Sequence, residues 1–124
     1  MTQAAVLGAN ASIMTTPVGT APGYQCRAWV NFNGTGTVAI RASGNVTSIT
    51  DNGTGRYIVN MTTAMPDTNF NAVNGVSFNN DGGSPFNGVW VGMYAGSTST
   101  VAMVAINSSS SPVDVTTMSV SVFR

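Results

Sequence analysis

The sequence predicts an all-β fold: an antiparallel, jelly-roll-like β-sandwich of about eight short strands. Apolar and polar residues alternate with a period of two in successive short runs. Clusters of Gly, Asn, Asp and Ser separate these runs at the spacing of about 8–12 residues that is typical of sandwiches and barrels. No segment carries the apolar stripe with a period of roughly 3.6 residues, and the capping residues, that predict a helix.

The chain has 124 residues, and domains of about 100–150 residues are the commonest size. Residues 1–23 are small, polar and rich in turn formers, which indicates an N-terminal arm and linker. The strand pattern occupies residues 24–124, where we expect a single β domain. The first part of the arm has neither a cationic start nor a long apolar stretch, so no signal peptide is expected.

The first strand is expected to begin near Tyr24. Cys26, Ala28, Val30 and Phe32 fall on one face of this strand, and polar or amphipathic residues fall on the other. We therefore expect Cys26 to be a small buried residue, as free cysteines usually are.

A β-hairpin is the clearest local signal. The loop 34–36 ends on Gly36, which suits a type I turn followed by a residue in the left-handed conformation. Matching the apolar faces of the two flanking strands places Trp29 opposite Arg41. We expect a cation–π contact between these two side chains.

Each later strand is bounded by residues that favour turns or interrupt pairing. Gly44-Asn45 and the run 51–55 are expected turns, and Pro66 ends the next ladder because it has no N–H to donate. Residues 79–87 form an expected loop, and residues 96–100 another turn. The expected strands lie at residues 46–50, 56–62, 73–78, 89–94, 101–106 and 117–123.

Two of these strands are apolar on both faces. Val89-Trp90-Val91 and the run 101–106 hardly alternate, whereas one face of a strand in an isolated sandwich should meet water. The chain also has no lysine to protect its sheet edges. Both features favour an oligomer, with strands from different copies packed around an axis. The alternative is that residues 101–106 form a central strand within one domain.

Charge is unusually scarce. Only 6% of the residues are charged, against about 25% in ordinary soluble domains, and four arginines balance four aspartates. We therefore expect no nucleic-acid partner and no membrane insertion. Without His, Lys or Glu, the usual zinc sites and Ser-His-Asp or lysine nucleophiles lack essential groups. We expect no catalytic residue, no metal and no cofactor, and a protein that is not an enzyme.

The aspartates are best interpreted as parts of turns. Asp51-Asn52-Gly53 and Asn80-Asp81-Gly82 resemble ordinary turns more than calcium loops, because neither has a second carboxylate nearby. Asp114 is a candidate partner for an arginine. A glycan-processing enzyme is the least favoured function, because it needs two facing carboxylates that the sequence does not indicate.

Large aromatic and amide side chains on loops and strand ends are the candidates for contact with a partner. Such residues bind sugars or protein surfaces. For Trp90, which lies between two valines, packing in the core or between subunits is the stronger alternative; for Phe86 the two interpretations are equally open. The candidate interaction residues are Trp29, Arg41, Asn80, Asp81, Phe86, Trp90 and Tyr94.

The run from Cys26 to Val46, CRAWVNFNGTGTVAIRASGNV, resembles a module common in tailed bacteriophages, notably marine and cyanobacterial ones. The similarity continues through SITDNGTG at residues 48–55, TTAMPD at residues 62–67 and Asn69-Phe70. The last strand, which closes on VFR, is also similar, more loosely. The module is usually identified as a tail-fibre or virion structural protein.

This resemblance implies a homotrimeric virion protein that is made in the host cytoplasm and contacts other virion proteins and a host surface glycan or protein. The arm over residues 1–23 would attach it to the particle, and exposed loops would touch the host. A short arm without a long shaft leaves a second role open: a capsid decoration protein that stabilises the head.

Overall fold

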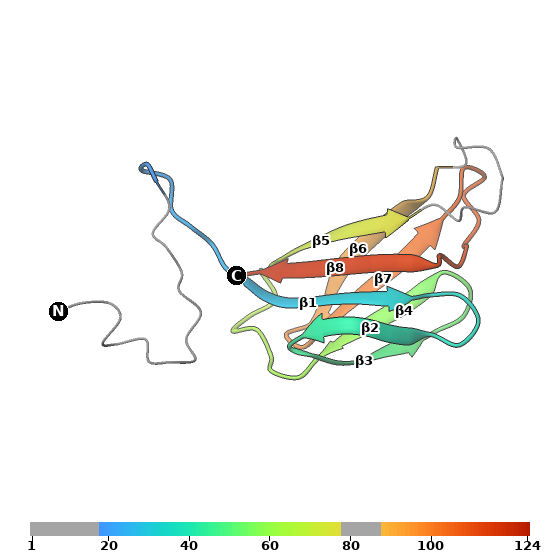
Figure 1. Ribbon diagram of the computed structural model, residues 1–124, viewed down its shortest axis with the longest axis horizontal. Helices are drawn as coiled ribbons and strands as arrows, with labels where there is room; N and C mark the ends of the chain where they lie inside the picture. The colour runs from blue at the N-terminus through green and yellow to red at the C-terminus, as the bar shows by residue number, and fades with distance from the viewer. Residues whose placement is uncertain (1–17, 78–87) are drawn as a thin grey trace.

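The computed structural model describes residues 18–77 and 88–124, and these form eight β-strands and no helix (Figure 1). The all-β prediction is therefore confirmed, and each expected strand is present with small shifts at its ends. The strands are β1 (Cys26–Asn33), β2 (Ala39–Gly44), β3 (Val46–Asp51), β4 (Arg56–Met61), β5 (Asn71–Ser77), β6 (Trp90–Ser97), β7 (Thr100–Ile106) and β8 (Thr117–Phe123).

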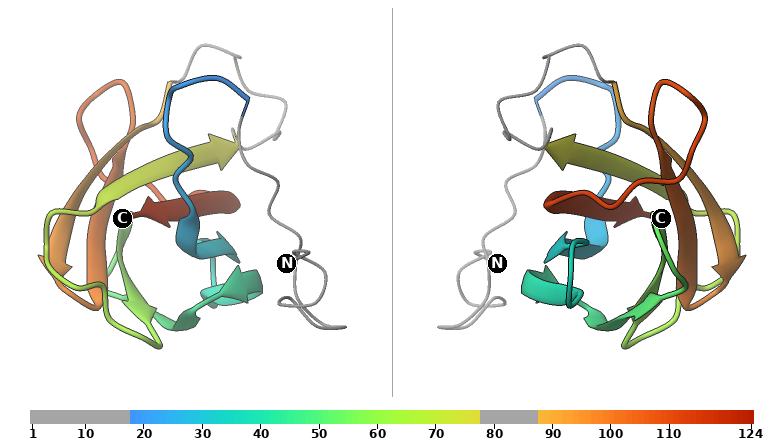
Figure 2. Two further views of the ribbon diagram at one scale, coloured as in Figure 1. Left: turned by 90° about the vertical axis from the view of Figure 1, so that its left-hand side faces the viewer. Right: turned by 90° about the vertical axis from the view of Figure 1, so that its right-hand side faces the viewer.

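The strands form two antiparallel four-stranded sheets, with the orders β2-β1-β8-β5 and β3-β4-β7-β6. Views along the molecule show the sheets as two layers around a common interior (Figure 2). At one side the edge strands β5 and β6 approach each other, and at the other side β2 and β3 do so. The two sheets thus enclose a single sandwich-like core.

Alternate residues of both sheets point into this core. The ring of Phe32 on β1 meets the edge of Tyr57 on β4, with centroids 5.3 Å apart and planes inclined at 71°. Such edge-to-face pairs add to the stabilisation that apolar burial itself provides. The largest fully buried side chains are Tyr57, Phe32, Met118, Val30, Val59, Val101, Val115, Val120 and Val122.

Tyr57 also carries the polar link between the two sheets. Its hydroxyl lies 2.7 Å from the carbonyl oxygen of Gly34 and 2.9 Å from Oδ1 of Asp114. The same carboxylate oxygen accepts a hydrogen bond from the Gly55 backbone N–H at 2.7 Å. The prediction that Asp114 pairs with an arginine is therefore wrong, because a tyrosine and a backbone amide use its oxygen instead.

The β1–β2 hairpin is present, but its predicted register is wrong. Trp29 pairs with Gly44, and a bulge leaves Arg41 without a direct partner on β1. An added Cβ at Gly44 would lie 2.5 Å from the indole Nε1, so the indole of Trp29 covers this glycine. Gly36 does adopt the expected left-handed conformation, with φ of +61°.

Arg41 has fixed partners other than Trp29. Its guanidinium donates to the carbonyl of Thr116, just before β8, at 2.6 Å and to the hydroxyl of Thr117, the first residue of β8, at 3.2 Å. A longer contact of 3.5 Å reaches Oδ1 of Asn31. The expected cation–π contact is replaced by these hydrogen bonds, because the bulge offsets the two strands.

Cys26 is exposed, so the prediction that it is buried is wrong. A register shift between Cys26 and Ala28 explains the difference, because it breaks the strict alternation of the strand. Ala28 pairs with the buried Val122, whereas Cys26 pairs with Phe123, which is only half-buried. The Cys26 thiol instead approaches the Ala28 carbonyl at 3.2 Å.

The apolar run 101–106 forms β7, which lies between β4 and β6. Val101, Met103 and Ala105 belong to the core. Ala102, on the opposite face of the strand, is also buried. The central-strand interpretation accounts for much of the two-faced apolar pattern within one chain.

Candidate functional site

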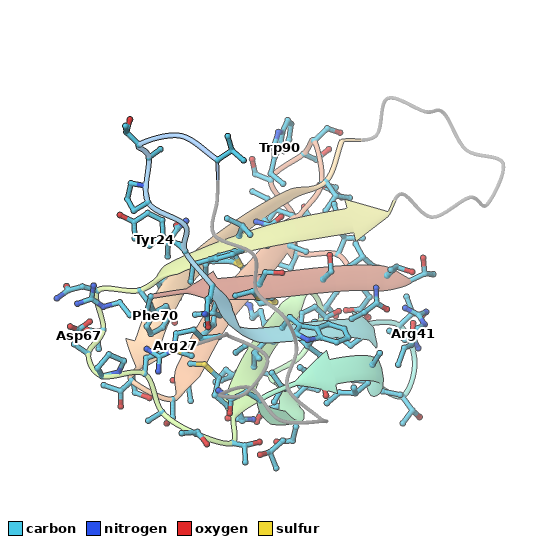
Figure 3. All side chains as sticks on the ribbon, turned by 60° about the vertical axis from the view of Figure 1, so that its left-hand side comes forward. Tyr24, Arg27, Arg41, Asp67, Phe70 and Trp90 are labelled. Carbon is cyan, nitrogen blue, oxygen red and sulfur yellow. The ribbon has the colours of Figure 1, made fainter. Side chains whose placement is uncertain are left out.

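The four candidate interaction residues that the structure describes do not converge on one site. Trp29 and Arg41 belong to the β2-β1-β8-β5 sheet, whereas Trp90 and Tyr94 belong to β6 in the other sheet. Figure 3 shows Trp90 and Arg41 at well-separated positions. Three further candidates, Asn80, Asp81 and Phe86, lie outside the described residues.

The β6 residues Trp90 and Tyr94 project from the outer face of the β3-β4-β7-β6 sheet. Their neighbours Val89, Val91 and Met93 pack against the core, so alternation sends Trp90 and Tyr94 outward. The exposed fractions are 58% for Trp90 and 68% for Tyr94. Packing of Trp90 in the core of its own chain is therefore wrong.

Strand register extends this exposed surface across the sheet. Trp90 pairs with Ile106, and Tyr94 pairs with Ala102, which in turn pairs with Ile58 on β4. Val104 lies between these rows, next to Gly92, where an added Cβ would meet its Cγ1 at 3.7 Å. We call this surface the apolar face: Trp90 and Tyr94 are its exposed residues, and beside them lie the partly exposed Ile58, Val104 and Ile106 and the buried Ala102.

The residues that border the apolar face are polar or charged on the side of β3 and uncharged on the side of β6. Arg56 pairs with Val104 and brings a positive charge to one side. Asn60 donates hydrogen bonds to the hydroxyls of Ser48 and Thr50, which makes the β3 side polar. On the opposite side β6 is the edge strand, and it carries no charged residue along its length. An apolar centre with a polar rim is typical of a protein contact surface.

A second feature is a pocket of about 410 Å³, lined by Tyr24, Asn69, Asn71, Phe123 and Arg124. The sequence did not indicate it, because its residues come from three separate parts of the chain. β1 and β5 both pair antiparallel with β8, so the residues preceding them meet beyond the end of β8.

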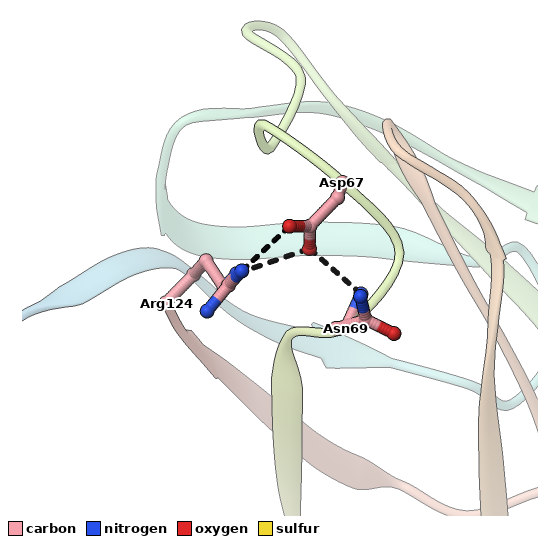
Figure 4. A network of polar contacts seen from close by, with 3 residues as sticks. All are labelled: Asp67, Asn69 and Arg124. Atoms are coloured by element: carbon pink, nitrogen blue, oxygen red, sulfur yellow. Dashed lines mark hydrogen bonds and ion pairs between the residues drawn. The ribbon is translucent and has the colours of Figure 1, made fainter.

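An ion pair fixes one wall of this pocket (Figure 4). Arg124 donates from Nε to Oδ1 of Asp67 at 3.0 Å and from Nη2 to Oδ2 at 2.5 Å. The Asn69 backbone N–H donates to Oδ1 at 2.9 Å. The hydrogen bond from Arg124, followed by that from Asn69, lowers the pKa of the Asp67 carboxyl. Asp67 was interpreted only as a turn residue, and its distant partner was missed.

Metal-ligating groups do not gather in the part of the chain that the structure describes: no three His, Cys, Asp or Glu residues lie close enough to hold an ion. Asp51 accepts a hydrogen bond from the Gly53 backbone N–H at 2.9 Å, which confirms its ordinary turn. Over the same residues, no helix has the length and apolar character needed to cross a membrane.

Comparisons of this chain with protein-family models, with curated proteins and with solved structures gave no match.

Proposed function

We propose that this protein is a structural component of a tailed-bacteriophage virion, of the tail-fibre type, which acts by contact and assembly rather than by catalysis. The apolar face is the observation that carries the proposal. It presents Trp90 and Tyr94 to solvent on a chain in which only 6% of residues are charged. A surface of this kind is costly in an isolated monomer and suits permanent contact with a neighbouring subunit.

The proposed neighbour is a second copy of the chain, in a homotrimer. The apolar face borders the edge strand β6, which has no lysine or other charge to discourage pairing. Closed rotational symmetry would cover the same face on every copy. We also propose that the sandwich is jelly-roll-like. The resemblance of residues 24–70 to a phage tail-fibre module supports the virion role.

The hydrogen-bonding of the described aspartates agrees with a structural role. Asp114 joins Tyr57 and Gly55, Asp67 joins Arg124, and Asp51 closes a turn. Each of these carboxylates supports local geometry. This distribution favours the structural proposal over a glycan-processing enzyme, which needs a carboxylate with a raised pKa opposite a second one.

The number of copies of this protein per particle, measured in purified particles of a phage that encodes it, tests whether the protein lies in the tail or on the head. Quantitative mass spectrometry against the major capsid protein should give tens of copies or fewer, and labelling in electron micrographs should mark the tail. Hundreds of copies over the head would replace the tail-fibre role with the capsid decoration role. Absence of the protein from washed particles would overturn the virion proposal.

The arm over residues 1–23 is the proposed attachment segment. Residues 18–23 are exposed and lead away from the sandwich, and residues 1–17 lie outside the described residues (Figure 1). Deletion of residues 1–23 should abolish binding to particles that lack the protein while the domain keeps its β-sheet circular dichroism. Undiminished binding of the folded deletion variant would contradict attachment through the arm.

A further inference from the structure

The pocket at the end of β8 has a composition that is distinct from the apolar face. It combines two aromatic rings, from Tyr24 and Phe123, with two side-chain amides, from Asn69 and Asn71. Its volume of about 410 Å³ lies within the range of about 300–1,000 Å³ that is usual for small-ligand pockets. Phe70 packs against the core, so the chain on either side of it is anchored.

The strand pairings explain why these groups converge. Phe123 pairs with Cys26 on one side and with Asn71 on the other. Tyr24 and Asn69 precede these two partners by two residues each, so both lie beyond the end of β8, beside Arg124. Tyr24 is 75% exposed, and its ring is therefore available to a ligand.

The electrostatics of the pocket favour an uncharged ligand. Arg124 is bound at two of its nitrogens by the carboxylate of Asp67, so the pair carries no net charge. A guanidinium has five N–H donors, and the pair uses two of them, which leaves donors directed elsewhere. The pair holds Arg124 as an oriented hydrogen-bond donor and compensates its charge.

A sugar ring has the complementary chemistry. Its C–H faces pack on aromatic rings, and its hydroxyls both donate to and accept from amides and accept from a guanidinium. Within the described part of the chain, the side-chain amides of Asn69 and Asn71 make no hydrogen bond that a sugar hydroxyl would have to displace. Their donors and acceptors are therefore available to a ligand.

We propose that the pocket formed by Tyr24, Asn69, Asn71, Phe123 and Arg124 binds a single neutral pyranose unit of a glycan. The proposal deepens the proposed tail-fibre role by naming a class of ligand for it, and it rests on that role for its biological meaning. Sugar binding by the purified chain is independent of where the protein sits in a particle. The pocket proposal and the virion proposal can therefore fail separately.

Saturation-transfer NMR on the full-length protein tests the pocket, with the methyl glycosides of glucose, galactose, mannose and N-acetylglucosamine as probes. At least one glycoside should receive saturation at its ring protons, with a dissociation constant in the millimolar range. Methyl glucuronide, which has a carboxylate, should bind more weakly than the matching neutral glucoside. Absence of transfer to every glycoside, or tighter binding of the glucuronide, would overturn the proposal.

Variants locate the binding. Tyr24→Ala and Asn71→Ala should each weaken the binding of the best glycoside by about tenfold. Tyr24→Phe, which keeps the aromatic face, should retain it. Trp29→Ala is the matched control, because Trp29 is an exposed aromatic on the same sheet outside the pocket. Unchanged binding in Tyr24→Ala and Asn71→Ala, or displacement of the sugar by a short uncharged peptide that binds more tightly, would contradict the proposed ligand.

Discussion

Tyr57 connects a core ring to a buried hydrogen-bond network. Its ring contacts Phe32. Its hydroxyl lies within hydrogen-bond distance of the Gly34 carbonyl, in the β1–β2 loop, and of the carboxylate of Asp114. A buried acceptor that loses its partner costs more than the net value of one hydrogen bond, because the acceptor has already lost its water. The tyrosine therefore contributes to stability through both its apolar and its polar parts.

Tyr57→Phe should lower the free energy of unfolding by about 1–3 kcal/mol, since the Gly34 carbonyl and Asp114 lose the hydroxyl. Urea unfolding followed by circular dichroism measures the change. Tyr24→Phe is the control: its hydroxyl is on an exposed side chain, so the change should stay within about 0.5 kcal/mol. Equal stability of Tyr57→Phe and the native protein would contradict a structural role for the buried hydroxyl.

The same residue predicts a dependence on alkaline pH. Burial, and then the hydrogen bond to Asp114, raise the pKa of Tyr57 above its ordinary value of 10.0. The folded state thus holds the phenol proton more tightly than the unfolded state. This contribution to stability is complete below about pH 10 and is lost as the pH rises further. Urea unfolding at a series of pH values should show a decline above about pH 10 that is smaller in Tyr57→Phe. An equally steep decline in both proteins would count against this assignment.

At the residue scale, the sequence predicts which residues form turns more reliably than it predicts which distant side chains bond to each other. The ordinary turn at Asp51 follows from Asp51 and Gly53, which lie two residues apart in the sequence. The partner of Asp67 is Arg124, and that of Asp114 is Tyr57, both of which are 57 residues away. Only the strand order brings these groups together. Cys26 was misplaced because a bulge changes which side of the strand it occupies.

The β1–β2 hairpin is the element in which local chemistry overrides apolar matching. Asn33 accepts hydrogen bonds at Oδ1 from the backbone N–H and the hydroxyl of Thr35, and its amide donates to the Thr35 carbonyl at 2.8 Å. The Gly34 N–H donates to the Val115 carbonyl at 2.9 Å. These contacts stabilise a loop of five residues, 34–38, between β1 and β2. The length of this loop determines which residues of β1 and β2 pair.

The corrected register predicts which neighbour determines the environment of Trp29. In a Trp90→Phe background, Trp29 is the remaining tryptophan, and its emission spectrum reports on its surroundings. Gly44→Val should shift the emission, because a Cβ at residue 44 would lie 2.5 Å from the indole Nε1. Arg41→Ala should leave the emission unchanged. A shift on Arg41→Ala with none on Gly44→Val would restore the cation–π contact and refute the register.

At the element scale, strands could be predicted because turn residues and alternation are local signals. Pro66 and the Gly-rich turns mark the ends of strands in the sequence itself. Bulges at Arg41 and near Arg27 depend on pairing with a strand elsewhere in the chain, and alternation alone does not reveal them. The pocket was missed for the same reason, because it forms where three strand ends meet.

For the whole molecule, the low charge and the apolar face have one explanation. Charged side chains keep copies of a protein apart, and this chain has neither lysine nor glutamate. Trp90 and Tyr94 are the most exposed aromatic residues within the strands, while the other sheet mixes the less exposed Trp29 and Val73 with serine, threonine and asparagine. Assembly through the apolar face would cover the exposed aromatic area.

A charge on the apolar face should separate the subunits. Tyr94→Glu would place a carboxylate within the contact, where it would be desolvated without a partner. Val73→Glu is the matched control, because Val73 is 45% exposed on the edge strand β5 of the other sheet. We expect Tyr94→Glu to be a folded monomer and Val73→Glu to keep the native assembly, as measured by size-exclusion chromatography with light scattering. Assembly lost in Val73→Glu but kept in Tyr94→Glu would assign the interface to the opposite sheet.

The most direct test of the central claim is the mass of the purified native protein in solution. Sedimentation equilibrium at micromolar concentration should give three times the chain mass of 12.7 kDa. A homogeneous species at the mass of a single chain would contradict assembly through the apolar face.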